Sequence, residues 1–475
     1  MAPLHSSSML FGALTAYLYF FYPAFSVSRV LPVSHDGHGG RPSGFRVLLH
    51  HVDSGRNLTR FEKIHRGIHR SRHRLQRLTS MAAATSPLGL GSGSGSDSGG
   101  GAGVQTQVHS GTGEFLMRLS IGTPAKPFTA IMDTGSDLIW TQCKPCSRCY
   151  KQPTPIFDPR KSSSFSHLPC STPLCAALPA SSCGADGCEY TYTYGDSSST
   201  QGAMGSEIFS FRGGDGKTPK KGDGFSVSGV AFGCGEDNEG DGFDQASGIV
   251  GLGRGPLSLV SQLVEPRFSY CLTRMGDPHP SSLLMGSLAG PKYPTSKPIT
   301  IGLLQNPAQQ SFYYLPIEGI SVGDTRLDID RSTFALEEDG SGGMIIDSGT
   351  TITYLEQSAY DVVRDAFVSQ TRLQIDNSRA GGLDLCFTLP ESKSRSQGDL
   401  EVPKLVLHFS GGSDLELPSN NYMIADSDVG VACLAMGASS GMSVFGNIQQ
   451  QNMLILYDLK NETMSFTPTN CNHME

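Results

Sequence analysis

Short apolar runs separated by glycine- and proline-rich turns dominate the chain from about residue 110 to its end. Runs of about four to eight residues, rich in β-branched and aromatic side chains, are typical of strands. Long helical periodicity is scarce, so the pattern predicts a mostly β body. The clearest runs are Glu114–Ile121, Phe128–Met132, Phe225–Phe232, Met344–Ile346, Val431–Ala435 and Met453–Tyr457.

A helical repeat of apolar positions is clearest in residues 358–373. Tyr360, Val363 and Phe367 fall on one face of a helix with about 3.6 residues per turn. The hydroxyl of Ser358 stands where it can accept a hydrogen bond from the first turn. We therefore predict a helix here, capped by Ser358.

A basic segment precedes the β-rich body. It carries six Lys and Arg side chains from position 63 to position 77, while Phe61, Ile64 and Ile68 recur at roughly helical spacing. Residues 89–103 are almost all Gly and Ser, a composition typical of flexible linkers that proteases reach easily. A cationic, partly helical block on such a linker indicates a removable propeptide; a disordered tail is the alternative.

Charge is divided unevenly along the 475 residues, whose formal net charge is −8. Residues 27–103 hold eleven Lys and Arg against four Asp and Glu, whereas residues 104–475 hold 25 against 40. Opposite net charges predict that the basic segment binds the acidic body. An acidic body also argues against nucleic-acid binding, which would require residues 56–77 to stay attached as a basic arm.

The first 26 residues contain no Lys, Arg, Asp or Glu. Their apolar stretch, residues 9–24, is shorter than the roughly 18 residues that a membrane-spanning helix needs. The small-x-small sequence at 24–26 is typical of a cleavage site. We predict a secretory signal, with an N-terminal membrane anchor as the alternative, and no stable membrane anchor afterwards.

All twelve cysteines lie between positions 143 and 471. An even number confined to one region of a secreted chain predicts disulfides. The C-x2-C-x2-C spacing at 143–149 also occurs in metal and iron–sulfur sites, but no second such group follows it, and we predict no metal and no cofactor. The G-x-G-x-G run at 251–255 lacks the spacing of a nucleotide-binding loop.

The body contains an internal repeat. An apolar run leads into D-T-G-S at 133–136, and another leads into D-S-G-T at 347–350. Each is followed by two apolar residues and a glycine, at 249–251 and at 444–446. One such triplet is an ordinary turn, but two copies in matching settings predict two homologous lobes.

Two aspartates that meet between such lobes have a specific chemistry. Asp133 and Asp347 would share one proton, because two adjacent carboxylates do not both ionise readily; aspartic proteases are the standard example. The ionised member takes a proton from a water, and the protonated member polarises an amide carbonyl. The neighbouring residues provide tight turns and short hydroxyl side chains: Thr134, Gly135, Ser136, Ser348, Gly349 and Thr350.

These motifs resemble those of pepsin-type aspartic proteases. The runs DTGSDLIWTQC, YTYGDSSSTQG, GIVGLGRGPLSLVSQL, FSYCL, IDSGTTITYL and VFGNIQQQN are similar to the plant nepenthesin-like branch. The resemblance covers about residues 110–475 and implies a bilobal fold of two homologous β-rich lobes around a central cleft. It also implies a flap with Tyr194 and Gly195, and a hydrogen bond to Tyr194 from Trp140, for which a simple core role is the alternative.

The resemblance further implies a disulfide framework, which the sequence by itself does not determine. The implied pairs are Cys143–Cys146, Cys149–Cys234, Cys170–Cys188, Cys175–Cys183, Cys271–Cys471 and Cys386–Cys433.

Together these observations predict a secreted aspartic endopeptidase, made as a zymogen and active at acidic pH on protein or peptide substrates. The expected parts are a signal peptide (1–26), a basic propeptide and linker (27–105), an N-terminal lobe with a cysteine-rich insertion (106–300) and a C-terminal lobe (301–475). Maturation is expected near residues 103–110. The alternative is a catalytically silent binding or inhibitor protein on the same fold, similar to plant xylanase inhibitors.

The remaining predictions concern partners and location. We expect a monomer that binds its own propeptide and its peptide substrates, and no nucleic acid. The secretory pathway would carry it to the apoplast, with the vacuole as the alternative. Asn461 begins an N-x-T sequence and is a predicted glycosylation site.

Overall fold

The computed structural model describes residues 44–83, 114–194, 198–212, 224–240, 243, 245–290, 297–378, 382–390 and 401–474. The predicted signal, the Gly/Ser linker, the expected maturation site and Gly195 of the flap lie outside these residues. Within the ranges just given, no helix is both long enough and apolar enough to span a bilayer.

The largest sheet contains fifteen strands in the described part of the chain. It joins strands from the beginning, the middle and the end of the sequence. In spatial order they are β13 (Ile299–Gly302), β26 (Thr463–Pro468), β25 (Met453–Asp458), β11 (Arg267–Cys271), β12 (Ser281–Met285), β1 (Phe45–His51), β2 (Phe115–Ile121), β3 (Lys126–Asp133), β10 (Gly248–Gly251), β4 (Trp140–Gln142), β9 (Gly224–Glu239), β8 (Ser199–Arg212), β7 (Gly187–Thr193) and β6 (Ala180–Gly184), with β5 (Ser166–His167) paired to β8.

Among the residues that the structure describes, three smaller sheets belong to the second half of the chain. Their strands are β15 (Thr325–Arg326), β14 (Ile317–Val322), β19 (Leu405–Phe409) and β20 (Ser413–Leu417); β16 (Met344–Ile346), β24 (Ser443–Phe445), β17 (Thr353–Glu356) and β23 (Met436–Ser439); and β18 (Cys386–Thr388), β22 (Val431–Leu434) and β21 (Met423–Asp426). The α-helices are α1 (Arg60–Ala83), α2 (Pro173–Ala176) and α3 (Gln357–Gln370). The predicted mostly β fold is confirmed.

The internal repeat of the sequence is a repeat of strand topology. In the first half, β10 pairs parallel with β3 and antiparallel with β4, and β4 pairs parallel with β9. In the second half, β24 pairs parallel with β16 and antiparallel with β17, and β17 pairs parallel with β23. The four strands have the same order and the same directions in both halves, which agrees with two homologous lobes.

The glycine that closes each apolar-apolar-Gly run allows two chain segments to cross. A β-carbon at Gly251 would lie 2.2 Å from the carbonyl oxygen of Asp137, and one at Gly446 would lie 2.2 Å from that of Ile352. Asp137 lies four residues after Asp133, and Ile352 lies five residues after Asp347. Only glycine fits beneath each turn, because no side chain has room at the crossing.

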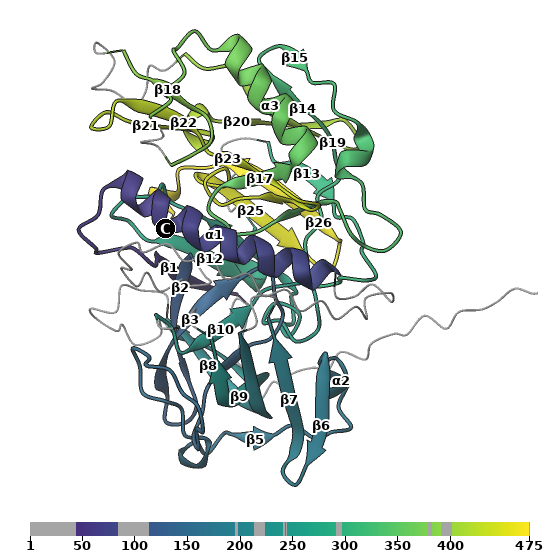
Figure 1. Cartoon of the computed structure of the whole chain (residues 1–475). Coiled ribbons are helices and arrows are strands. Elements are labelled where there is room, and N and C mark those ends of the chain that lie inside the picture. The colour runs from purple at the N-terminus through teal and green to yellow at the C-terminus, as the bar shows by residue number, and fades with distance from the viewer. Residues whose placement is uncertain are drawn as a thin grey trace, which may run out of the picture. The chain divides into compact units, whose positions relative to one another are not determined.

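The basic segment contributes a strand as well as the predicted helix. β1 lies between β12 and β2, where Phe45, Val47 and Leu49 point into the core. Helix α1 begins with a capping box, in which Thr59 and Glu62 each accept a hydrogen bond from the other's backbone N–H. Figure 1 shows α1 in purple, with β2, β3 and β10 below it and β17, β23 and β25 above it.

The predicted helix in the second half is present, but its cap was assigned wrongly. Tyr360, Val363 and Phe367 are buried on one face of α3, as expected. The helix begins one residue earlier, and the carboxylate of Glu356 accepts the backbone N–H of Ser358 at 2.8 Å. A carboxylate at this end also interacts favourably with the helix dipole, so Glu356 replaces the predicted Ser358 cap.

Every cysteine is paired, and all twelve lie among the described residues. Two of the six pairings implied by the resemblance are present, and the other four are wrong. The observed disulfides are Cys143–Cys234, Cys146–Cys149, Cys170–Cys183, Cys175–Cys188, Cys271–Cys471 and Cys386–Cys433.

Strand pairing explains the first of these corrections. Because β4 runs parallel to β9, Cys143 comes to lie beside Cys234, and its backbone N–H donates to the carbonyl of Gly235 at 2.8 Å. The Cα atoms of these two cysteines are 5.2 Å apart, within disulfide range. Cys146 and Cys149 are then left to pair with each other in the following loop.

We predict that Gly446→Ala is destabilised by about 1–3 kcal/mol or more, because its β-carbon would meet a backbone atom that has little room to move. Gly302→Ala is the control, since no atom lies within 4 Å of a β-carbon there. Urea unfolding measures both. Equal stability of the two variants would show that the close crossing is not what requires glycine at 446.

Candidate active site

The two aspartates of the repeat lie together, each at the end of a buried strand. Asp133 is the last residue of β3, Asp347 directly follows β16, and both residues are fully buried. The backbone N–H of Gly135 donates to Asp133 Oδ1 at 3.0 Å, and that of Gly349 donates to Asp347 Oδ1 at 3.3 Å. Each turn therefore fixes its own carboxylate with a backbone donor.

The last residue of each tetrapeptide holds the second carboxylate oxygen. Ser136 Oγ donates to Asp133 Oδ2 at 2.5 Å, and Thr350 Oγ1 donates to Asp347 Oδ2 at 2.6 Å. The two halves thus orient their aspartates with equivalent hydrogen bonds. Each Oδ1 also accepts a hydrogen bond from one cation, which is described below.

The middle residues of the two turns connect the halves. Thr134 Oγ1 lies 3.2 Å from Ser348 Oγ and accepts the backbone N–H of Ser348 at 3.1 Å. The same hydroxyl lies 3.2 Å from Asp347 Oδ1. Behind this contact, the side-chain amide of Asn447 donates to the carbonyl of Ser348 at 3.0 Å. These bonds hold the two aspartates in register across the junction.

One arginine of helix α1 occupies the space between the carboxylates. Arg74 Nη2 donates to Asp133 Oδ1 at 2.5 Å and to Asp347 Oδ1 at 2.6 Å, and its Nε donates to Asp347 Oδ2 at 2.5 Å. The guanidinium passes close to Gly349, where a β-carbon would lie 2.4 Å from Arg74 Cζ. The glycine of the second turn therefore also makes room for this cation.

This contact changes the protonation of the pair. Burial by itself would raise the pKa of Asp133, but the charges of Arg74 and Arg77 outweigh it and hold the pKa well below its usual range. The same carboxylates raise the pKa of Arg74 against the opposing effect of its burial. The contact with Arg74 therefore favours the ionised form of Asp133 over the predicted protonated state of the pair.

A second arginine of α1 lies between Asp133 and Tyr194. Arg77 Nη2 donates to Asp133 Oδ2 at 2.9 Å, and its guanidinium carbon lies 4.2 Å from the centre of the Tyr194 ring. The Tyr194 hydroxyl accepts a hydrogen bond from Trp140 Nε1 at 2.8 Å, as the resemblance implied. Trp140 is also fully buried, so its core role and its hydrogen bond to Tyr194 exist together.

A further ion cluster attaches α1 to the start of the β-rich body. Arg70 Nε donates to Glu114 Oε1 at 2.6 Å, and Arg70 Nη1 donates to Asp53 Oδ2 at 2.9 Å. His51 lies 2.9 Å from the other oxygen of Glu114. Burial would raise the pKa of Glu114, but Arg70 and His51 lower it to about 2. The predicted attraction between the basic segment and the acidic body is present as these specific ion pairs.

Apolar side chains of α1 pack on both sides of its arginines. Near its beginning, Phe61, Ile64 and Ile68 join a buried cluster with Ile352 and Tyr354 of the second half. Near its end, Leu78 and Ala82 join another cluster whose remaining members are Phe312, Tyr314, Ile345, Met442 and Val444. The helix therefore covers apolar surface on either side of the aspartate pair.

Comparison with known proteins identifies the family. Aspartic proteinase nepenthesin-1 from Nepenthes gracilis is 50% identical over 461 residues, which cover 97% of this chain and 97% of that protein. Aspartic proteinase nepenthesin-2 from the same organism is 46% identical over 94% of this chain and 95% of its own length. The chain belongs to the nepenthesin-like plant aspartic proteases. It is therefore classed as an aspartic-type endopeptidase, a hydrolase.

Two family models match the protease, and their descriptions name a different activity. The one described as "Xylanase inhibitor N-terminal" matches residues 115–287, and "Xylanase inhibitor C-terminal" matches residues 312–468. Among solved structures, "Crystal structure of edgp" has a TM-score of 0.63 at 17% identity and covers 91% of this chain and 96% of its own. Basic 7S globulin from soybean has a TM-score of 0.57 at 19% identity, covering 76% and 95%. At these identities the similarity shows the fold alone.

Arg74 and Arg77, which bond to the aspartate pair of the protease, were not singled out from the sequence. Arg66, Arg70, Arg74 and Arg77 are spaced three or four residues apart, so they lie on one face of α1. That periodicity was present in the sequence, but it was hidden among other basic residues. Arg72 lies on the same helix but outside this face, and its side chain is exposed.

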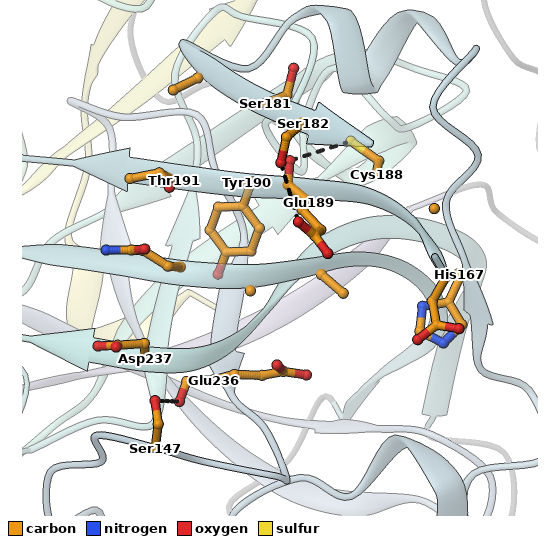
Figure 2. A pocket seen from close by; sticks show the side chains of 16 residues that line it. Ser147, His167, Ser181, Ser182, Cys188, Glu189, Tyr190, Thr191, Glu236 and Asp237 are labelled. Carbon is orange, nitrogen blue, oxygen red and sulfur yellow. Dashed lines mark hydrogen bonds between the residues drawn. The ribbon is translucent and has the colours of Figure 1, made fainter. Parts of the chain in front are cut away.

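A cavity of about 670 Å³ lies in the cysteine-rich part of the protease, and its lining includes neither aspartate of the pair. Figure 2 shows Glu189 and Tyr190 of β7, Glu236 and Asp237 of β9, and His167 of β5 around it. Burial and the nearby charge of Glu189 raise the pKa of Glu236. The cavity lacks the paired-carboxylate geometry, so the aspartates beneath α1 are the better candidate for chemistry.

The Glu114 cluster predicts how pH affects the docking of α1. The pKa of Glu114 is about 2 in the folded chain and 4.5 ordinarily. This difference contributes on the order of 3 kcal/mol to stability at neutral pH. This contribution is fully present above pH about 4.5 and is lost as the pH falls toward 2. The unfolding temperature of the full chain should therefore drop through this range.

Glu114→Gln should be less stable near pH 6 and lose less stability between pH 4.5 and 2. Calorimetry tests this with Asp347→Asn present in both proteins, so that neither digests itself. A Glu114→Gln protein whose stability falls with pH as steeply as that of its parent would contradict this role for Glu114.

Proposed function

We propose that the chain is a secreted aspartic endopeptidase, made as a zymogen, in which Asp133 and Asp347 are the catalytic residues. The observation that carries this proposal is their placement, since two buried carboxylates in equivalent turns both bond to one nitrogen of Arg74. Once the guanidinium leaves, repulsion between the carboxylates favours a single shared proton. One aspartate then acts as the base that activates water, and the other as the acid toward the substrate carbonyl.

Activity should be highest in acid, because the pair must retain one proton. The side chains around the pair have supporting roles: Thr134 and Ser348 hold the two turns together, and Gly135, Ser136, Gly349 and Thr350 orient the carboxylates. Trp140 positions Tyr194 of the flap over the substrate. No step needs a metal or a cofactor.

In the proposed zymogen, the segment described here as residues 44–83 belongs to the propeptide (27–105). Arg74 occupies the position of the reacting groups, and Arg77 holds the flap tyrosine against Asp133. The lobes would be residues 106–300 and 301–475, although β25 and β26 of the second lobe, and β13 at the boundary, lie in the same sheet as strands of the first. Acidification would weaken the ion pairs of α1 and favour its release.

Secretion is supported by the six disulfides, which form in oxidising compartments. We propose the apoplast as the destination, with the vacuole as the alternative, and a monomeric enzyme. Asn461 is exposed in the turn between β25 and β26, where a glycan would have room.

The second candidate is a catalytically silent binding protein, which the descriptions of the two family models favour. The presence of both aspartates, both sets of orienting hydroxyls and Tyr194 favours the enzyme. The two functions differ in one measurable respect, turnover.

We predict that Asp133→Asn lowers kcat by about 10²–10⁴-fold, because an amide replaces a group that must exchange a proton. Cleavage of a denatured protein near pH 3–5, with and without pepstatin, measures this loss. Asp428→Asn is the matched control, since Asp428 is exposed on the surface. Undiminished turnover by Asp133→Asn would reject the proposed pair, and an inactive wild-type protein would favour the binding protein.

We also predict that Arg74→Ala makes the zymogen process itself at a higher pH than the wild type. Loss of one partner from a buried ion pair typically costs about 3–5 kcal/mol, which would strongly favour the undocked helix. Arg72→Ala on the same helix removes an exposed arginine and should leave the threshold unchanged. The measurement is the release of the N-terminal segment against pH. An unchanged threshold for Arg74→Ala would contradict the inhibitory role.

A further inference from the structure

Another buried carboxylate lies in the loop that follows Asp133. Asp137 follows it by four residues and is 9% exposed. Asp137 Oδ1 accepts the backbone N–H of Gly255 at 2.9 Å, and Oδ2 accepts the hydroxyl of Ser311 at 2.5 Å. Ser311 belongs to the segment that leads into the second half, so this carboxylate also bridges the two halves of the chain.

The glycine run at 251–255 is shaped around Asp137. A β-carbon at Gly251 would lie 2.2 Å from the Asp137 carbonyl oxygen, one at Gly253 would lie 2.3 Å from Oδ1, and one at Gly255 would lie 2.0 Å from Oδ2. All three separations are far below van der Waals contact. This run therefore has a different purpose from a nucleotide-binding loop, because its glycines form a cradle for one carboxylate.

The second half of the repeat has no charge at the equivalent position. Four residues after Asp347 stands Thr351, whose backbone N–H and hydroxyl both contact Ser71 Oγ of α1. The shared turn geometry therefore does not require an acid at this place. The carboxylate of Asp137 is a feature of the first half alone and calls for its own explanation.

Gly251, the first glycine of the cradle, is the strand partner of Asp133, so the cradle places Asp137 beside the aspartate pair. Burial raises its pKa, the hydrogen bonds from Ser311 and Gly255 oppose this, and the charge of Asp133 adds to the rise. Two phenols also face it, from Tyr192 of β7 and from Tyr313; burial raises the pKa of both, so they stay neutral. The guanidinium of Arg254 in the glycine run bonds instead to the carbonyl of Leu304 at 2.7 Å.

We propose that Asp137 is a positioning residue of the aspartate pair. Its negative charge, held in the glycine cradle, keeps the shared proton on Asp133 and Asp347 up to a higher pH once α1 has left. The physical reason is mutual repulsion, since each ionised carboxylate makes it harder for the other to lose its proton. In the full chain Arg74 and Arg77 mask this effect. The proposal rests on the proposed protease function.

The test is the pH profile of kcat/KM for the processed enzyme, which reports the ionisation of the free enzyme. Asp137→Asn should move the upper limb of this profile to lower pH by about 0.5–1 unit, because the neighbouring charge is gone. Ser311→Ala should move it in the same direction by less, since loss of this donor disfavours the ionised form of Asp137. The double variant should shift no further than Asp137→Asn alone.

Asp428→Asn is the matched control and should leave the limb in place. If the upper limb of the kcat/KM profile stays in place or moves to higher pH in Asp137→Asn, the proposal is overturned and Asp137 is a purely structural residue. This holds whatever happens to kcat or to the unfolding temperature. If Asp137→Asn fails to fold, Ser311→Ala alone decides by the same criterion. Failure of the protease function itself would be visible separately, as an inactive wild-type enzyme or an active Asp133→Asn variant.

Discussion

Two carboxylates buried against each other need either a proton or a cation between them, and in the full chain the cation is Arg74. Its guanidinium bonds to both aspartates at hydrogen-bond distance while fully buried. Most other features of α1 follow from this placement. The helix must lie close to the second turn, where Gly349 gives room, and its flanking apolar side chains must cover the surface on either side. The same interaction that satisfies the buried charges also lies where both carboxylates are fully shielded from solvent.

The scaffold brings the aspartates together by repeating one arrangement of four strands. Each copy places its aspartate at the end of a strand, orients it with a glycine N–H and a hydroxyl, and passes the following chain beneath a second glycine. The large sheet then fastens the halves together, because strands from the end of the chain pair with strands of the first half. The geometry of the pair is thus a consequence of topology and backbone contacts more than of long side chains.

The two halves have the same backbone arrangement, but they differ in their charged residues and in the segments that pack over them. The first half alone carries Tyr194, with its bond from Trp140, and the buried carboxylate of Asp137. The second half contributes the uncharged Thr351, which contacts α1 instead. Asymmetry of this kind gives two chemically identical aspartates different surroundings, and different surroundings are what separates an acid from a base.

The residue order alone is sufficient to predict the mostly β class, the repeat, both aspartates with their turns, and the opposite charges of the basic segment and the body. These features are local or periodic, so spacing and residue type are enough to reveal them. The packing of distant segments, in contrast, makes Phe45–His51 a strand, places Glu356 at the cap of α3, pairs four disulfides differently, and selects Arg74 and Arg77 from the basic residues of α1 as those that reach the aspartates. Each of these depends on which distant segment lies alongside, because strand partners, disulfide partners and buried ion pairs are chosen by proximity in space and leave little signal in the order of residues.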